Sequence, residues 1–151
     1  MIALILAAAL IQSEPETEAA GAVLDRMHAA ASAADGAVYF DQFTPDARFI
    51  GTDATERWTL TGFRAYAEPF FARGRGWTYH PSERVMTLAP IDCRCIVWFD
   101  ERLQNASYGE TRGSGVLRLT DDGWKIEQYV LSFAIPNDDA AAVVEIIRAG
   151  D

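Results

Sequence analysis

The stretch that decides the fold runs from Gly109 to Phe133 and reads GETRGSGVLRLTDDGWKIEQYVLSF. It holds two segments suited to β-strands, separated by the turn sequence Asp121-Asp122-Gly123, in which glycine can adopt a positive φ. After the turn, successive side chains alternate between two faces, as in a strand. The face that ends in Gln128 and Ser132 changes from bulky apolar to small and polar, and the other face changes from charged to aromatic and aliphatic. In a strand that only covers a core, the chemical character of the side chains would not change along both faces. We therefore expect this strand to run from a closed core toward a cavity.

The composition fits one globular domain. The chain has 151 residues, of which 50% are hydrophobic and 23% are charged, and this length allows a substantial core. Its 22 acidic and 13 basic residues give a net charge of −9. Nucleic acids and anionic membranes are bound through basic surfaces, so we expect neither as a partner.

The N-terminus begins with a short apolar segment. Residues 1–13, MIALILAAALIQS, are too few to span a bilayer as a mature helix, but they fit a short signal peptide. No lysine or arginine precedes the apolar run, and no cysteine directly follows it to carry a lipid anchor. We expect a periplasmic or secreted protein without a stable membrane anchor; the alternative is a cytoplasmic protein that begins with a helix. Residues 14–20 form an acidic leader, either mobile or the frayed start of a helix, before a single domain over 21–151.

Sequence patterns predict helices first and strands afterwards. The expected helices cover 22–34, 39–43 and 61–71, with a further helix capped by Asn137. The expected strands cover 47–53, 77–88 and 94–103 before the opening stretch. Helices followed by a meander of strands indicate an α+β fold, in which helices cover one face of a curved antiparallel sheet.

Several motifs are shared with one superfamily. They are MHAAA at 27–31, FIGTDATERWT at 49–59, GWTY at 76–79, RGSGV at 112–116 and WKI at 124–126. Together they resemble the SnoaL-like branch of the nuclear transport factor 2-like superfamily, over nearly all of 23–137. The resemblance implies a cone-shaped curved antiparallel sheet wrapped around N-terminal helices, with an extra C-terminal helix in this chain. It also implies a ligand pocket in the concavity and often a homodimer across the outer face of the sheet.

The resemblance does not fix one activity. The superfamily includes polyketide cyclases, ketosteroid isomerases, dehydratases, ligand binders and protein-binding modules, so fold does not give function. Its enzymes place an Asp base, alone or with His partners, inside the cone. Close relatives often have His where this chain has Val130, so one possible general base is missing.

Arginine side chains indicate which strand faces point inward, because an isolated arginine on a sheet usually points outward. On this basis Asp53, Glu101 and Gln128 face a common pocket. Asp53 and Glu101 would then form a proton-transfer pair, with apolar walls raising the pKa of one carboxyl. The alternative places Asp53 in a turn and pairs Glu101 with an arginine at a strand end.

Three further residues are candidates for contact with a substrate. His28 lies on the apolar face of its expected helix, where it either stabilises an oxyanion or packs as a hydrogen-bonded core residue. Arg57 and Arg112 can bind a carboxylate or enolate oxygen through the planar guanidinium; the alternative is that they pair with Glu56 and Glu110.

Aromatic and polar residues complete the expected binding site and interface. The residues expected to contact a ligand are Arg57, Trp58, Trp77, Tyr79, Arg112, Gln128 and Ser132. Core packing or a dimer face is the alternative for the aromatic residues among them. The residues expected at a homodimer contact on the outer face of the sheet are Tyr129, Leu131 and Phe133.

The two cysteines and two histidines suggest neither a metal site nor redox chemistry. Cys93 and Cys95 lie two apart, too distant for easy bridging in a strand, so we expect no disulfide and read them as small buried residues. The sequence contains no nucleophile elbow, no nucleotide-binding glycine motif and no metal-binding His spacing. We therefore expect no metal and no cofactor.

Three functional classes follow. The first is a small-molecule-binding domain with a pocket inside the cone. The second is a cofactor-free isomerase, cyclase or dehydratase that uses a pocket carboxylate as general base, with His28, Arg57 or Arg112 stabilising the oxyanion. The third is a protein-association module that uses the outer face of the sheet.

Overall fold

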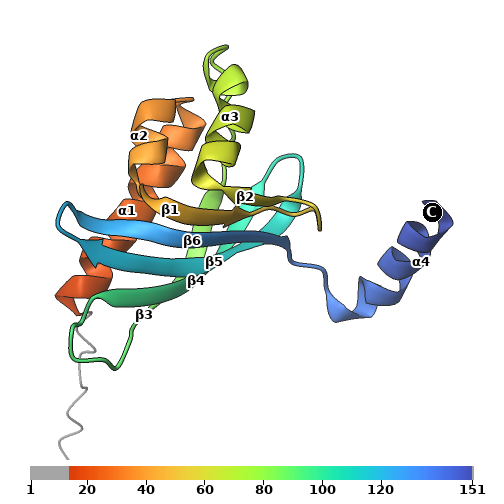
Figure 1. The fold of residues 1–151 in the computed structure, drawn as a ribbon. Coiled ribbons are helices and arrows are strands. Elements are labelled where there is room, and N and C mark those ends of the chain that lie inside the picture. The colour runs from red at the N-terminus through yellow and green to blue at the C-terminus, as the bar shows by residue number, and fades with distance from the viewer. Residues whose placement is uncertain (1–13, 151) are drawn as a thin grey trace, which may run out of the picture.

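The computed structural model describes residues 14–150, and a six-stranded sheet lies at its centre (Figure 1). The strands are β1 (Phe43–Ile50), β2 (Arg57–Thr59), β3 (His80–Leu88), β4 (Ile96–Asn105), β5 (Gly109–Thr120) and β6 (Gly123–Phe133). The helices are α1 (Pro15–Ser32), α2 (Gly36–Asp41), α3 (Leu60–Phe71) and α4 (Ala140–Gly150), with a short 3₁₀ helix, η1 (Asn137–Asp139), before the last. The predicted signal peptide at 1–13 lies outside the described residues.

The sheet is curved and mixed, with strand order β2-β1-β6-β5-β4-β3. Neighbouring strands are antiparallel except β1 and β6, which are parallel. The predicted curved sheet with N-terminal helices is confirmed, but the expectation of a purely antiparallel sheet is wrong at this pair. β1 and β6 are distant in sequence and are not joined by a hairpin, so nothing in the connection requires them to run antiparallel.

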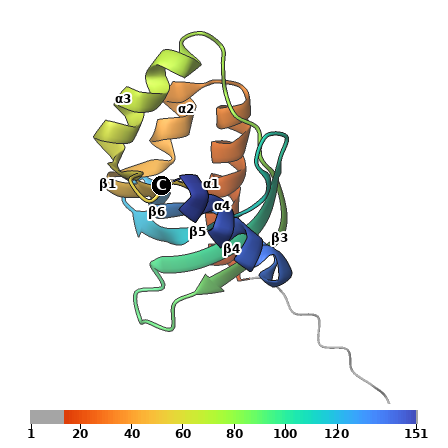
Figure 2. The ribbon, with the colours of Figure 1, turned by 90° about the vertical axis from the view of Figure 1, so that its right-hand side faces the viewer.

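Helices α1, α2 and α3 cover one face of the sheet, and the core lies between these layers (Figures 1 and 2). Apolar residues on one side of α1, such as Leu24 and Met27, pack toward inward-facing strand residues such as Val97 and Leu117. From α2, Tyr39 places its ring 5.6 Å from that of Phe71 at the end of α3. This packing fixes α3 over one end of the sheet.

The first helix begins earlier than the sequence predicted. Pro15 occupies its first turn, where the missing N–H costs nothing, and Glu16 and Glu18 complement the helix dipole there. Glu16 is also held by Arg94, whose Nε donates a hydrogen bond of 2.7 Å to its carboxylate. The segment expected as an acidic leader is therefore mostly ordered as helix.

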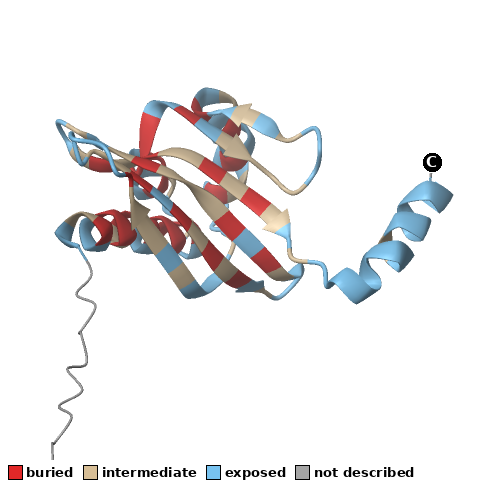
Figure 3. Ribbon diagram, turned by 90° about the horizontal axis from the view of Figure 1, so that it is seen from below, coloured by how far each residue is buried: buried red, intermediate tan, exposed pale blue. Residues whose placement is uncertain are grey.

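The C-terminal helix α4 lies apart from the sheet and helices (Figure 1). It has no buried residue, and Figure 3 shows it exposed along its length. The prediction of an extra C-terminal helix is confirmed. Among residues 14–150, no helix is long and apolar enough to cross a lipid bilayer.

Candidate functional site

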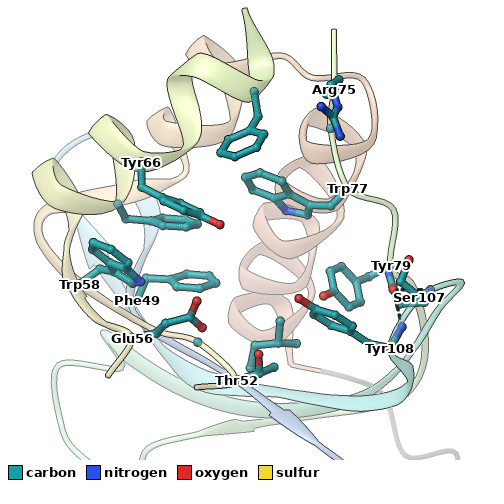
Figure 4. Close-up of a pocket in the computed structure, with 16 residues that line it drawn as sticks. Phe49, Thr52, Glu56, Trp58, Tyr66, Arg75, Trp77, Tyr79, Ser107 and Tyr108 are labelled. Atoms are coloured by element: carbon teal, nitrogen blue, oxygen red, sulfur yellow. Dashed lines mark hydrogen bonds between the residues drawn. The ribbon is translucent and has the colours of Figure 1, made fainter. Parts of the chain in front are cut away.

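A cavity of about 430 Å³ opens between α3, the end of β1, β2 and the segment that leads into β3 (Figure 4). Its size lies in the range of small-molecule sites, about 300–1,000 Å³. Aromatic side chains make up most of its wall: Phe49, Trp58, Phe63, Tyr66, Phe70, Trp77, Tyr79 and Tyr108. We call it the aromatic cavity.

The aromatic wall follows from local sequence spacing. Phe63, Tyr66 and Phe70 recur at helical intervals on α3 and so share the side of the helix that lines the cavity. Opposite them, Phe49 of β1 stacks on Phe63 with ring centroids 4.0 Å apart. Trp58 of β2 stacks on Tyr66 at 5.4 Å. These contacts fix the rings and leave their remaining surface to the cavity.

The cavity wall also carries non-aromatic polar side chains: Thr52, Glu56, Arg75, Asn105 and Ser107. Among the lining residues in the described range 14–150, the one carboxylate is Glu56. Its Oε2 accepts a hydrogen bond of 3.2 Å from the backbone N–H of Asp53. The carboxylate lies over Gly51, where a Cβ would collide with it, so glycine makes room for this position. Arg75 lies at the opposite end of the cavity (Figure 4).

A second polar group of residues lies deeper, between α1 and the sheet. His28 Nε2 and Glu101 Oε1 are 2.7 Å apart, and Arg84 Nε donates a hydrogen bond of 2.7 Å to Glu101 Oε2. Tyr129 Oη donates to Glu101 Oε1 at 3.3 Å. We call His28, Arg84, Glu101 and Tyr129 the buried polar network.

The partners of Glu101 keep its carboxyl ionised. Burial alone would raise the pKa of Glu101, but hydrogen bonds and charges from His28 and Arg84 outweigh it and hold that pKa below its ordinary value. Burial, with the Glu101 charge beside it, raises the pKa of Tyr129 well above the ordinary range. The phenol therefore stays neutral and can donate its hydrogen bond.

The buried polar network is closed to the aromatic cavity. Glu101 is 0% exposed and His28 is 9% exposed, and none of the four residues lines the cavity. The ring of Phe49 stands between the two regions, since it lines the cavity and stacks on Tyr129 at 5.7 Å. Arg84 continues outward to Asp25, to which its Nη1 donates at 2.7 Å. The network joins α1 to β3, β4 and β6.

Glu101 faces inward as predicted, but it does not share a pocket with Asp53, so the predicted proton-transfer pair is wrong. His28 lies directly against Glu101. Glu101 sits on the inner face of β4 with Val97, Phe99 and Leu103, all buried. His28 comes from the apolar face of α1. The sequence did not identify Arg84 as the second partner, because a bulge in β3 between Ser82 and Val85 turns it inward.

The prediction that Gln128, Val130 and Ser132 face the cavity is wrong. A bulge in β6 places one extra residue, Glu127, between Ile126 and Gln128, so the faces exchange beyond it. Gln128 then pairs with Val116 and Ser132 with Arg112, on the outer face of the sheet.

The same bulge overturns the predicted homodimer contact. Tyr129 and Leu131 turn inward, where they are 3% and 9% exposed, and Leu131 lines the aromatic cavity. Phe133 shares their face and lies at the open end of the strand, 5.3 Å from the ring of Tyr108. These three residues do not form an outer-face contact surface.

Opposite the bulge, two glycines of β5 accommodate the inward aromatic residues. A Cβ on Gly113 would collide with Tyr129 Oη, and one on Gly115 would collide with the backbone carbonyl of Gln128. Glycine in a strand commonly marks such close approach. These glycines are a sequence signal that could have indicated the bulge.

Asp53 does not face the pocket. It is exposed in the turn before β2, where its Oδ1 accepts hydrogen bonds from Thr55 N–H and Oγ1–H. These hydrogen bonds lower the pKa of Asp53, with the side-chain bond from Thr55 the larger cause. The inward orientation predicted for Asp53 is therefore wrong, because the strand ends at Ile50.

The two arginines expected at the ligand also lie elsewhere. Arg57 is exposed on β2 and does not line the aromatic cavity. Arg112 is exposed on the outer face, 3.5 Å from Asp100 across the strand pair. By contrast, Trp58, Trp77 and Tyr79 do line the aromatic cavity, and their role in binding stays a prediction.

The cysteines differ most plainly from expectation. Cys93 and Cys95 form a disulfide, whereas the sequence suggested free thiols in a strand. The segment is a loop between β3 and β4, and Arg94 adopts a φ of 48°. That turn brings the two Cα atoms to 5.1 Å, which is close enough to bridge.

The fold defines a class of protein: a curved, mixed sheet with helices on one face. A sequence profile of the SnoaL-like domain matches residues 21–136. The chain belongs to the SnoaL-like family, as its sequence motifs predicted. A comparison with curated proteins found no match.

Solved structures of low identity share this fold. A proposed aromatic ring hydroxylase from Novosphingobium aromaticivorans is 18% identical, with a TM-score of 0.66 over 83% of this chain and 94% of that one. A proposed dehydratase of the nuclear transport factor 2-like family from Streptomyces avermitilis is 11% identical, with a TM-score of 0.67 over 80% and 97% of the two chains. A proposed ketosteroid isomerase from Shewanella frigidimarina is 22% identical, with a TM-score of 0.59 over 76% and 94%. At these identities the similarity shows the fold alone.

Proposed function

We propose that this protein binds a small, largely apolar molecule in the aromatic cavity. The observation that carries the proposal is the wall itself: eight of the sixteen residues around about 430 Å³ are aromatic. Flat apolar ligands gain from burial against such rings and from stacking on their faces. The rings are already held by contacts with one another, so binding costs little side-chain conformational entropy.

The test is binding of naphthylmethanol, a neutral flat probe, measured by calorimetry. Trp58→Ala removes one wall, and we expect it to weaken binding by about tenfold or more, the effect of an aromatic contact worth about 1.5 kcal/mol. Trp98→Ala is the matched control, because Trp98 is 44% exposed on the outer face of β4. Equal binding of the probe by both variants would refute the proposal.

A second candidate is a cofactor-free reaction beside a carbonyl, with a cavity carboxylate as general base. Glu56 is the observation that favours it, since it is the carboxylate on the cavity wall. Glu101 is unsuited to that role, because both of its oxygens are engaged in a closed, buried network. Exchange of α-protons for deuterium in an added ketone, lost in Glu56→Gln, would establish this reaction over binding alone.

We also propose that the protein is exported. The Cys93–Cys95 disulfide supports this, because disulfides persist mainly in oxidising compartments. Intact-mass measurement of protein from the native host tests whether the protein is exported and its signal peptide removed. A mass that lacks the first residues is expected, and a retained Met1 would contradict export.

A further inference from the structure

Glu56 differs from the other interior carboxylate in having no cationic partner. Among residues 14–150, no lysine, arginine or histidine forms an ion pair with it, whereas Glu101 has both Arg84 and His28. Its one hydrogen bond comes from the backbone N–H of Asp53. A half-buried carboxylate without a counter-charge is stabilised when a ligand supplies a positive charge beside it.

The rings around Glu56 suit a cation as well as an apolar body. Figure 4 shows its carboxylate directed into the cavity, beside Phe49 and Trp58. The face of an aromatic ring is electron-rich and attracts an ammonium group placed over it, tryptophan most strongly. Phe49 is stacked on Phe63 and Tyr129, so Trp58, which stacks on Tyr66 alone, is the ring beside Glu56 that can take an ammonium group.

The electrostatics across the cavity agree with this geometry. Burial raises the pKa of Tyr79 to about 12, and the neighbouring Tyr108 and the Glu56 charge add to the effect. Arg75 is exposed and lies at the opposite end, so it does not neutralise Glu56 (Figure 4).

We propose that the ligand of the aromatic cavity is an aromatic or apolar amine, bound in its protonated form with the ammonium group beside the Glu56 carboxylate. This inference rests on the proposed binding function and narrows its ligand class. The ammonium donates to the free lone pairs of the carboxylate, and its apolar body stacks among the rings.

Three probes of similar shape but different charge test this ligand class. Naphthylmethylamine is a cation at neutral pH, naphthylmethanol is neutral, and naphthoic acid is an anion. Calorimetry compares their binding to the full chain, to Glu56→Gln and to Glu68→Gln. Glutamine keeps the oxygen that accepts from Asp53 N–H and removes only the charge. Glu68 is the matched control, because it is exposed on α3 and does not line the cavity.

The amine is expected to bind the wild type and Glu68→Gln at least about tenfold tighter than the alcohol, as a charge-assisted contact of about 1.4 kcal/mol requires. In Glu56→Gln the preference should fall to near unity. Equal binding of amine and alcohol to the wild type would overturn the proposed ligand class but leave the proposed binding function intact. If naphthoic acid bound most tightly, the proposed ligand class would also be wrong, and Arg75 would be the residue that recognises the charged group of the ligand. Failure of all three probes to bind would refute the proposed function itself.

Discussion

The aromatic cavity and the buried polar network each contain an inward-facing glutamate, and the two glutamates differ in their surroundings. Glu101 is fully buried, and Arg84, His28 and Tyr129 satisfy both of its oxygens. Glu56 is half-buried on a cavity wall and receives one backbone hydrogen bond. The burial of a carboxylate therefore says little about whether it binds a ligand. Whether its oxygens still lack hydrogen-bond partners says more. The network joins α1 to the sheet, and the cavity is the site that we propose for a ligand.

The largest expected effect is on stability, and it tests whether the buried polar network holds the fold together. Glu101→Ala leaves Arg84 and His28 without their acceptor in the interior, so we expect a loss of about 3–5 kcal/mol in the free energy of unfolding. Urea denaturation measures it. Glu68→Gln, on the exposed surface of α3, should leave the midpoint unchanged. A stable Glu101→Ala protein would mean that the network is not structural.

A smaller effect is expected where the network meets β5. Gly113→Ala places a Cβ against Tyr129 Oη, so we expect a loss of about 1–3 kcal/mol from overpacking. Ser114→Ala, one residue on and on the outer face, should change stability by less than about 0.5 kcal/mol. Equal effects of the two substitutions in urea denaturation would contradict the bulge that turns Tyr129 inward.

The smallest effect is expected from pH. Because the pKa of Glu101 is lowered in the folded protein, its ionised form stabilises the fold above the ordinary carboxyl value of 4.5, and this stabilisation is lost as pH falls below that value. The difference in unfolding free energy between wild type and Glu101→Gln should therefore shrink as the pH falls below 4.5. A difference that grows in that range would contradict an ionised Glu101.

Sequence periodicity predicted the fold well because each helix and strand carries its own apolar pattern. The inward position of Glu101 follows from strict alternation along β4, with no irregularity between Val97 and Leu103. The orientation of Gln128 could not be predicted in that way. The extra residue in β6 is set by pairing with β5, which is a tertiary contact that local alternation does not encode.

The candidate site was predictable only in part for a similar reason. Trp58, Trp77 and Tyr79 were expected at a ligand, and they line the cavity. Glu56 was considered only as a partner for Arg57, since the approach of its carboxylate to Gly51 depends on the turn that joins β1 to β2. The Cys93–Cys95 disulfide likewise depends on a backbone turn that two cysteines alone do not reveal.

The central claim is that ligands bind in the aromatic cavity. The chain has four tryptophans, and two of them, Trp58 and Trp77, line the cavity. Fluorine NMR of fluorotryptophan-labelled protein, titrated with naphthylmethylamine, observes all four at once. The signals of Trp58 and Trp77 should shift, while those of Trp98 on the outer face and Trp124 at the far end of β6 stay in place. Shifts confined to Trp98 or Trp124 would contradict the claim.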